Sequence, residues 1–217
     1  DNNEKAQETV AKTGLTWGRE AIPAGLYING SVDLTNGAVV VDGSKTEAPD
    51  TSSAPANGTF SAAKNSIVMV DGQDITGNNA AITGVTEANV TIDKDSKLYI
   101  DGAQKGKTYH VIAGADSAWN DTNIISNNAL LKFAGESNAD SKFDVTASYD
   151  KVDNVYGAGA VEIANIVDRT LETKDEGDKA FDFFNAAANA NNNATKAAQI
   201  AAFNSAANMG ELAGVNH

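Results

Sequence analysis

The 217-residue sequence contains no cysteine and only two histidines, His110 and His217. The lack of cysteine excludes disulfide bonds, thiolate zinc sites, iron–sulfur ligation and cysteine catalysis. Two histidines are too few for a multi-histidine metal site. Aromatic residues make up only 6% of the chain, so the core must be built largely from Val, Ile, Leu and Ala. No apolar run approaches the ~20 residues that a membrane-spanning helix needs.

Basic residues are also scarce. The chain has 16 Lys and Arg against 29 Asp and Glu, which gives a formal net charge of −13. Phosphate recognition requires a basic face, so we expect no nucleic-acid partner. An anionic membrane surface is disfavoured for the same reason.

The composition changes twice along the chain. Residues 1–13 are polar and predict a short surface helix or a frayed end. Residues 14–156 consist of short apolar runs separated by Gly, Asn and Asp, and residues 157–217 are helical in pattern and rich in Ala and Asn. We therefore expect a polar N-terminal segment, a mainly-β region and a C-terminal helical region with these boundaries.

The middle region repeats one local pattern, in which an apolar run is followed by one small or polar residue and then by Gly. β-forming residues suit a half-buried strand, and Gly permits the positive φ that a tight corner needs. The pattern occurs at residues 27–30, 39–43, 68–72, 81–84, 98–102 and 111–114. Strands at such spacing indicate a repeating all-β architecture.

Two topologies compete for residues 14–156. An antiparallel meander would place Asp-Gly in a two-residue turn with a return strand directly after it. The residues that follow these Asp-Gly pairs are instead polar, as in Gln73-Asp74 and Gln104-Lys105, so a right-handed parallel β-helix is favoured over a β-sandwich or other all-β fold. The polar stretch at residues 44–57 is predicted to be an insertion that projects from the repeat, which a solenoid tolerates.

Two stretches resemble a known family. Residues 105–114 (KGKTYHVIAG), followed by apolar runs at 129–133 and 142–147, resemble the last coils of a bacterial autotransporter passenger. In that family a G-x-T/S-Y-x-V/I strand precedes paired strands that cap the β-helix. Residues 201–217 (AAFNSAANMGELAGVNH) resemble the helical linker that leads from the passenger into the outer-membrane barrel.

The resemblance implies a bacterial protein that is displayed at the cell surface or secreted, whose parent chain continues into a membrane barrel after His217. The implied function is non-enzymatic, in adhesion or as a structural stem, with a host protein or a glycan as a possible ligand. Some relatives cleave the linker at an Asn-Asn pair, but the matching position here is Phe203-Asn204, so this cleavage is not expected. The alternatives are a β-helical glycan-active enzyme and a surface-layer structural module.

No residue is predicted to be catalytic, cofactor-binding or metal-binding. His110 is expected to be a solvated or hydrogen-bonded strand histidine that, if its strand is regular, shares a face with Thr108 and Ile112. Glycan cleavage needs clustered carboxylates with a nearby base, and the two arginines, Arg19 and Arg169, lie outside the repeats. Three aspartates, Asp42, Asp71 and Asp101, end equivalent runs and are expected to be solvated turn residues rather than a cation site.

The C-terminal region predicts two helices. Thr173 and Glu176 fit a capping box that would begin a helix carrying Phe181 and Phe184 on one face. Asn193 is expected to cap a second helix, which carries Ile200 and Phe203. We predict that these four large apolar side chains are buried, by packing on the β region, on each other or on a second copy of the chain.

Overall fold

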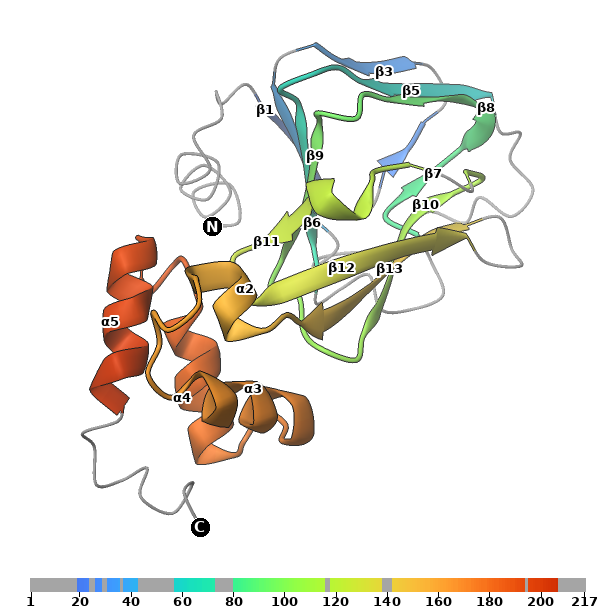
Figure 1. The fold of residues 1–217 in the computed structure, drawn as a ribbon. Coiled ribbons are helices and arrows are strands. Elements are labelled where there is room, and N and C mark those ends of the chain that lie inside the picture. Colours follow the sequence, from blue (N-terminus) through green and yellow to red (C-terminus); the bar gives the residue numbers. More distant parts are fainter. Residues whose placement is uncertain are drawn as a thin grey trace. The chain divides into compact units, whose positions relative to one another are not determined.

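The computed structural model describes residues 19–23, 26–28, 31–35, 37–42, 57–72, 80–115, 118–137, 142–193 and 195–206. These residues form mainly β-sheet, with helices toward the C-terminus, so the mainly-β prediction is confirmed (Figure 1). They divide into two compact units. The sheet unit holds the described residues up to Ser126 together with Lys132–Ser148, and the helical unit holds Asn127–Leu131 and the described residues from Tyr149 onward.

The first sheet of the sheet unit is entirely parallel. Its strands lie in the order β1 (Arg19–Pro23), β4 (Ala38–Asp42), β6 (Ile67–Asp71), β9 (Lys97–Asp101) and β11 (Ile124–Ser126). Every neighbouring pair in this sheet runs parallel. The prediction of parallel pairing is therefore confirmed for these strands.

The second sheet combines both kinds of pairing. Its strands lie in the order β12 (Leu131–Ser137), β13 (Lys142–Tyr149), β10 (Thr108–Ala113), β7 (Ile82–Thr83) and β2 (Leu26–Tyr27). β2, β7 and β10 pair in parallel, whereas β13 runs antiparallel to β10. The third sheet is parallel and consists of β3 (Ser31–Leu34), β5 (Gly58–Ala62) and β8 (Val85–Ile92).

The chain visits the three sheets in a recurring order. β1, β2 and β3 belong to the first, second and third sheet, and β6, β7 and β8 repeat that sequence. The sheets remain open, and parallel strands of one sheet are always separated along the chain by strands of another. This arrangement follows from the chemistry of parallel pairing, which requires a long connection between neighbouring strands rather than a tight hairpin.

Apolar side chains in register form the core of the sheet unit. Val39 pairs with Val68, which pairs in turn with Leu98, and all three are buried. Residues 67–70 of β6 are buried without alternation, because a strand covered on both faces has no solvent-facing side. The uninterrupted apolar run at these residues is therefore a consequence of their central place in the first sheet.

Two buried serines hold equivalent corners between the third and the first sheet. Ser66 donates its hydroxyl to the Leu34 carbonyl (2.9 Å), and Ser96 donates to the Asp93 carbonyl (2.8 Å). Both side chains are fully buried, so each hydroxyl needs a partner within the fold. The backbone also links the two corners, because Lys97 N–H donates to the Ser66 carbonyl.

The helical unit contains α2 (Val152–Tyr156), α3 (Ala164–Thr173), α4 (Lys179–Ala187) and α5 (Lys196–Ala206). Its own core includes Phe181, Phe184 and Phe203, which are buried as predicted, while Ile200 is partly buried at the edge. The helices bury these side chains against one another, which was one of the three predicted solutions. None of the described helices is long and apolar enough to cross a membrane.

The predicted helix starts were partly wrong. Thr173 is the last residue of α3 and donates its hydroxyl to the Arg169 carbonyl, so it begins no helix. Asp178 caps α4 instead, because its carboxylate accepts from the amides of Ala180 and Phe181 at 3.1 Å. A carboxylate at this position also interacts favourably with the positive end of the helix dipole.

The cap of α5 also differs from the prediction. Thr195 accepts from the Ala198 amide and so caps the helix, two residues after Asn193. The Asn193 side chain turns back and donates to the carbonyls of Ala186 and Ala187 at the end of α4. Asn193 thus satisfies carbonyls that the helix end leaves without intrahelical partners.

Candidate functional site

One pocket of the sheet unit, lined by described residues only, has a buried aromatic floor. Trp119 precedes the short helix η1 (Asp121–Asn123), and Phe143 lies near the start of β13. Their rings are 6.3 Å apart, and Trp119 also meets the core ring of Phe60 edge-on at 6.3 Å. Because Trp119 and Phe143 are only 3% and 4% exposed, the floor is fixed by the core of the unit.

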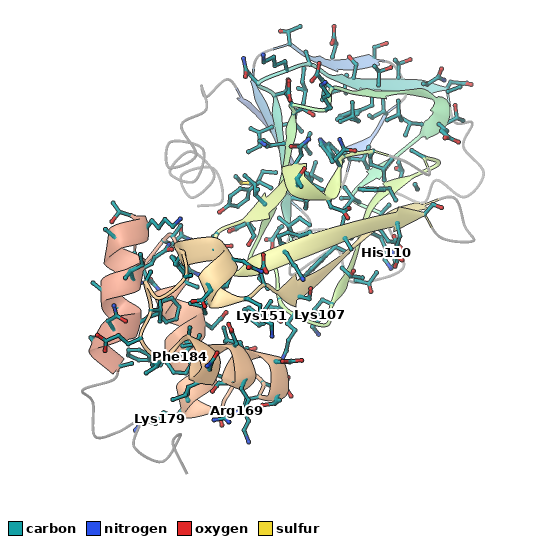
Figure 2. All side chains as sticks on the ribbon, in the orientation of Figure 1. Lys107, His110, Lys151, Arg169, Lys179 and Phe184 are labelled. Carbon is teal, nitrogen blue, oxygen red and sulfur yellow. The ribbon has the colours of Figure 1, made fainter. Side chains whose placement is uncertain are left out.

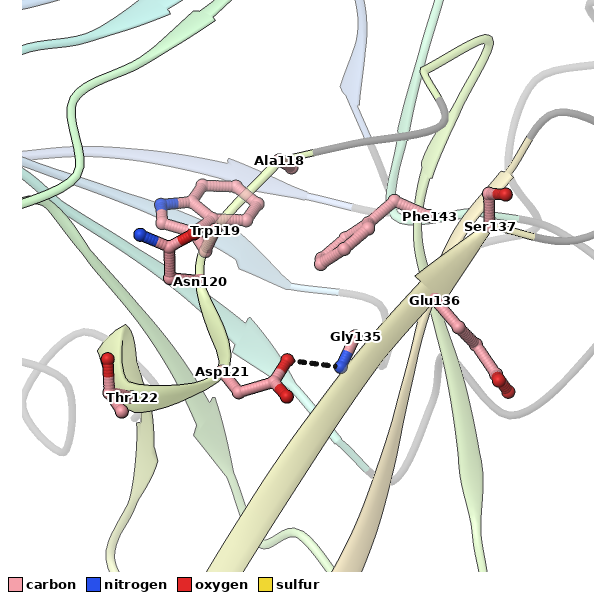
Figure 3. Close-up of a pocket in the computed structure, with 9 residues that line it drawn as sticks. All are labelled: Ala118, Trp119, Asn120, Asp121, Thr122, Gly135, Glu136, Ser137 and Phe143. Atoms are coloured by element: carbon pink, nitrogen blue, oxygen red, sulfur yellow. Dashed lines mark hydrogen bonds between the residues drawn. The ribbon is translucent and has the colours of Figure 1, made fainter.

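Gly135 of β12 allows the Phe143 ring to reach the floor. A Cβ at this position would lie 2.4 Å from Phe143 Cζ, so any larger residue would displace the ring. The Gly135 amide donates to Asp121 Oδ1 at 2.8 Å, which joins η1 to β12 across the pocket (Figure 3). One oxygen of the Asp121 carboxylate is therefore held in place by the backbone.

The rim of the pocket is polar and carries negative charge. Five exposed polar residues line it, namely Asn120, Asp121, Thr122, Glu136 and Ser137. Two of them are carboxylates, and none of the residues that line the pocket is basic. The volume is about 500 Å³, which falls within the range of pockets that hold small molecules.

One polar atom of the floor lacks a partner. The indole Nε1 of Trp119 is buried and has no hydrogen-bond acceptor among the described residues. Figure 3 shows this nitrogen on the Asn120 side of the ring, away from Phe143. A buried donor without an acceptor costs about 1–3 kcal/mol, so an oxygen atom supplied from outside the chain would be stabilised at this place.

His110 is hydrogen-bonded, as one of the two predicted alternatives required. Its Nδ1 lies 2.6 Å from Asp144 Oδ1, and the two residues face each other across β10 and β13 (Figure 2). The side chain of His110 is 18% exposed and that of Asp144 is 6% exposed. The pair therefore joins the two strands through a largely buried contact.

The face predicted for His110 depended on a regular strand, and β10 does not meet this condition. The register of β10 shifts between His110 and Ile112, so the strand is not regular. Val111 and Ile112 are both buried as a result, whereas His110 is half-buried and Thr108 is exposed. The irregularity is a β-bulge, which reorients the side chains that follow it.

The fold brings two of the three aspartates considered from the sequence, Asp71 and Asp101, together as neighbours. Asp71 and Asp101 are register partners at the ends of β6 and β9, and Asp42 ends the neighbouring strand β4. In the part of the chain that the structure describes, no group of three or more His, Cys, Asp or Glu residues is placed to hold a metal ion.

The arginines and Asn204, which were considered from the sequence, are not among the residues that line the pocket. Arg169 is exposed on α3, and Arg19 belongs to β1. Asn204 uses both ends of its amide structurally, since it accepts from the Glu162 amide and donates to the Ala160 carbonyl. The linker motif at residues 208–212 lies outside the described residues, and so does the insertion predicted at residues 44–57 apart from Asn57.

The pocket was not predicted from the sequence. A usable signal was present in residues 118–123 (AWNDTN), where one tryptophan is followed by a run of short polar side chains. The other side of the pocket comes from β12 and β13, which the sequence does not connect to this run. No protein-family model, curated protein or solved structure matches the chain.

Proposed function

We propose that the chain is the C-terminal part of a bacterial autotransporter passenger, exposed at the cell surface or secreted. In this proposal the sheet unit is a stack of coils of a right-handed parallel β-helix, and the role is adhesive or structural rather than enzymatic. The observation that carries it is the recurring order in which the chain visits three sheets, with parallel strands in register within each.

The register of the first sheet supports the β-helical part of the proposal. Stacked coils require equivalent residues to pair from coil to coil, and Val41, Val70 and Ile100 do so while fully buried. The corner serines Ser66 and Ser96 also hold equivalent positions, because each directly precedes one of the register partners Ile67 and Lys97. Repeated pairing of like positions is typical of solenoids, in which each repeat packs mainly on its neighbours.

The end of the sheet unit supports the passenger assignment. The family resemblance implies a strand within residues 105–114 followed by paired strands that cap the stack. β10 occupies the first position, β13 pairs with it antiparallel, and β12 lies beyond β13 in the same sheet. A change from parallel to antiparallel pairing suits a cap, because it ends the repeat that another parallel coil would continue.

The helical unit follows these strands, as the linker of the proposal requires. Its polar surface and small side chains suit passage through a barrel lumen during export, and the barrel itself would be supplied by residues after His217. We also propose that a second copy of the chain associates through this helical region.

A surface-display experiment tests this function. Residues 1–217 are joined directly, without an added spacer, to the first strand of an autotransporter barrel and expressed with a secretion signal in a Gram-negative host. We expect antibody labelling of intact cells that is lost after external protease. In a second variant residues 201–217 are replaced by a Gly-Ser segment of equal length, and we expect display to fall at least fivefold.

The matched control replaces the predicted insertion, residues 44–57, with a Gly-Ser segment of its own length and should leave display unchanged. Absence of the intact chain from the cell surface would overturn the passenger proposal. Equal display by all three proteins would show that residues 201–217 are not a specific linker.

A further inference from the structure

We propose that the pocket between η1 and β12 binds an uncharged sugar residue of a glycan. This inference deepens the proposed function, on which its adhesive meaning rests, by assigning a site and a ligand class. It begins from the buried indole nitrogen of Trp119, which has no acceptor among the described residues. Buried donors in native proteins are nearly always paired, so an acceptor from outside the chain that reached this nitrogen beside Asn120 would be stabilised there.

The rim determines the charge of the ligand. Asp121 and Glu136 are carboxylates, which accept hydrogen bonds and donate none when ionised. Since Asp121 Oδ1 is already occupied by the Gly135 amide, its second oxygen and the Glu136 carboxylate are the groups that would accept from a ligand. A ligand that offers hydroxyl donors is favoured, and an anion is repelled because no lining residue is basic.

The floor and the volume determine the shape of the ligand. The buried rings of Trp119 and Phe143 form an apolar base, and the hydrogen-bonding side chains stand at its border. A molecule that fits has a weakly polar face and a border of hydroxyl groups that both donate and accept. A pyranose ring has this distribution, and a pocket of about 500 Å³ accommodates one residue within a longer chain.

The indole resonance of Trp119 provides a direct test on the whole 217-residue chain. The ¹H–¹⁵N signal of Trp119 is assigned as the indole peak that a Trp119→Phe variant lacks. Glucose, galactose, mannose and N-acetylglucosamine are then titrated, with glucuronate and sialic acid as anionic probes. We expect at least one neutral sugar to shift this signal in a saturable way and neither anionic sugar to do so.

Two substitutions of the same chemical kind locate the site. Glu136→Gln removes a rim carboxylate and should weaken binding about tenfold, which corresponds to the loss of one charge-assisted hydrogen bond. Glu87→Gln makes the same change at an exposed position of β8 and should leave the affinity unchanged. Both side chains are exposed, so neither change should impair folding.

An indole signal that stays fixed with every neutral sugar would overturn the inference and leave the pocket with water only. Equal weakening by both substitutions, or tighter binding of the anionic sugars, would also overturn it. These outcomes are independent of the display experiment, because a chain that is correctly exported can still lack a sugar site.

Discussion

Two tyrosines of the helical unit make the stability of the folded chain depend on pH in the alkaline range. Tyr149 donates its hydroxyl to Asn185 Oδ1 at 2.6 Å, and Tyr156 donates to Gln199 Oε1 at 2.7 Å. Burial raises the pKa of both phenols above the ordinary value of 10.0, and the Glu176 carboxylate adds to this effect at Tyr149. Both tyrosines belong to the helical unit, so the neutral phenol is part of its core.

We expect the helical unit to lose stability as the pH rises above about 10. Below that pH both phenols are protonated in the folded and the unfolded chain, and the pH has no effect through them. Above it the unfolded chain releases protons that the folded chain retains, so the free energy of unfolding falls. Denaturant titrations followed by helical circular dichroism at several pH values between about 9 and 11 measure this slope.

Tyr156→Phe is the matched variant, since it keeps the ring and removes the ionisable hydroxyl. The alkaline slope should become flatter, and stability at neutral pH should drop by about 1 kcal/mol because Gln199 loses a partner. A free energy of unfolding that is constant across this pH range would contradict the raised pKa values.

The roles of some individual residues could be predicted from the sequence, and those of others could not. Phe181, Phe184 and Phe203 could be predicted to be buried because their spacing on a helix is a local property. The choice between Thr173 and Asp178 as a cap could not, since both have suitable side chains and only the position of α4 decides between them. The pocket was also out of reach, because it joins Trp119 to Gly135 and Phe143 through strand pairing.

Among the strands, those of the first sheet were the easiest to predict. β4, β6 and β9 contain apolar runs followed by Asp-Gly. In β6 and β9 the run is uninterrupted because consecutive residues on both faces of the strand are buried. The strands of the third sheet were missed because β3 and β8 are largely exposed or half-buried and their apolar residues are diluted by polar ones. The Lys-x-Ser repeat at residues 64–66 and 94–96 could have located the strands of the third sheet, since it marks equivalent corners between the third and the first sheet.

Two glycines at strand corners allow a direct test of how closely the elements approach. Gly114 follows β10 with φ +90°, and a Cβ there would lie 1.9 Å from the Val85 carbonyl oxygen of β8. Gly106 has a similar φ of +77°, but a Cβ would meet no atom within 4 Å. Both positions have a positive φ, and they differ in the space around a side chain.

We expect Gly106→Ala to cost about 1–2 kcal/mol, which is the strain of the left-handed conformation alone. Gly114→Ala should cost about 3 kcal/mol or more, because the backbone of β8 would also have to move. Thermal or denaturant unfolding followed by the far-ultraviolet β signal measures both. Similar losses of stability for the two variants would show that β8 does not approach Gly114 in this way.

For the molecule as a whole, each unit has a core of its own. The sheet unit is centred on in-register aliphatic side chains, and the helical unit on the aromatic side chains around Phe184. A region with its own core can in principle fold by itself. The charge of −13 is a property of the entire chain and favours solubility at neutral pH.

Phe184→Asp tests this division. A carboxylate in place of a fully buried ring should destabilise the helical unit by at least the ~3–5 kcal/mol typical of Phe→Ala. Hydrogen exchange should accelerate for the amides of α3, α4 and α5, while those of β6 and β9 keep their protection. Ala201→Asp adds the same charge at an exposed position of α5 and should change little.

If exchange in the helical unit is the same in Phe184→Asp and in the unmodified chain, the aromatic core does not stabilise this unit. If β6 and β9 lose protection to the same extent, the two units do not fold separately.

The order of strands also has a mechanical consequence. Among the described strands, the three nearest the N-terminus, β1, β2 and β3, each lie at the border of a different sheet and pair with one described neighbour. A pulling force applied at the N-terminal side therefore peels one strand at a time, and each step breaks the hydrogen bonds of a single pair. The sheet unit would lengthen in small increments under load and would dissipate mechanical work gradually rather than in a single rupture.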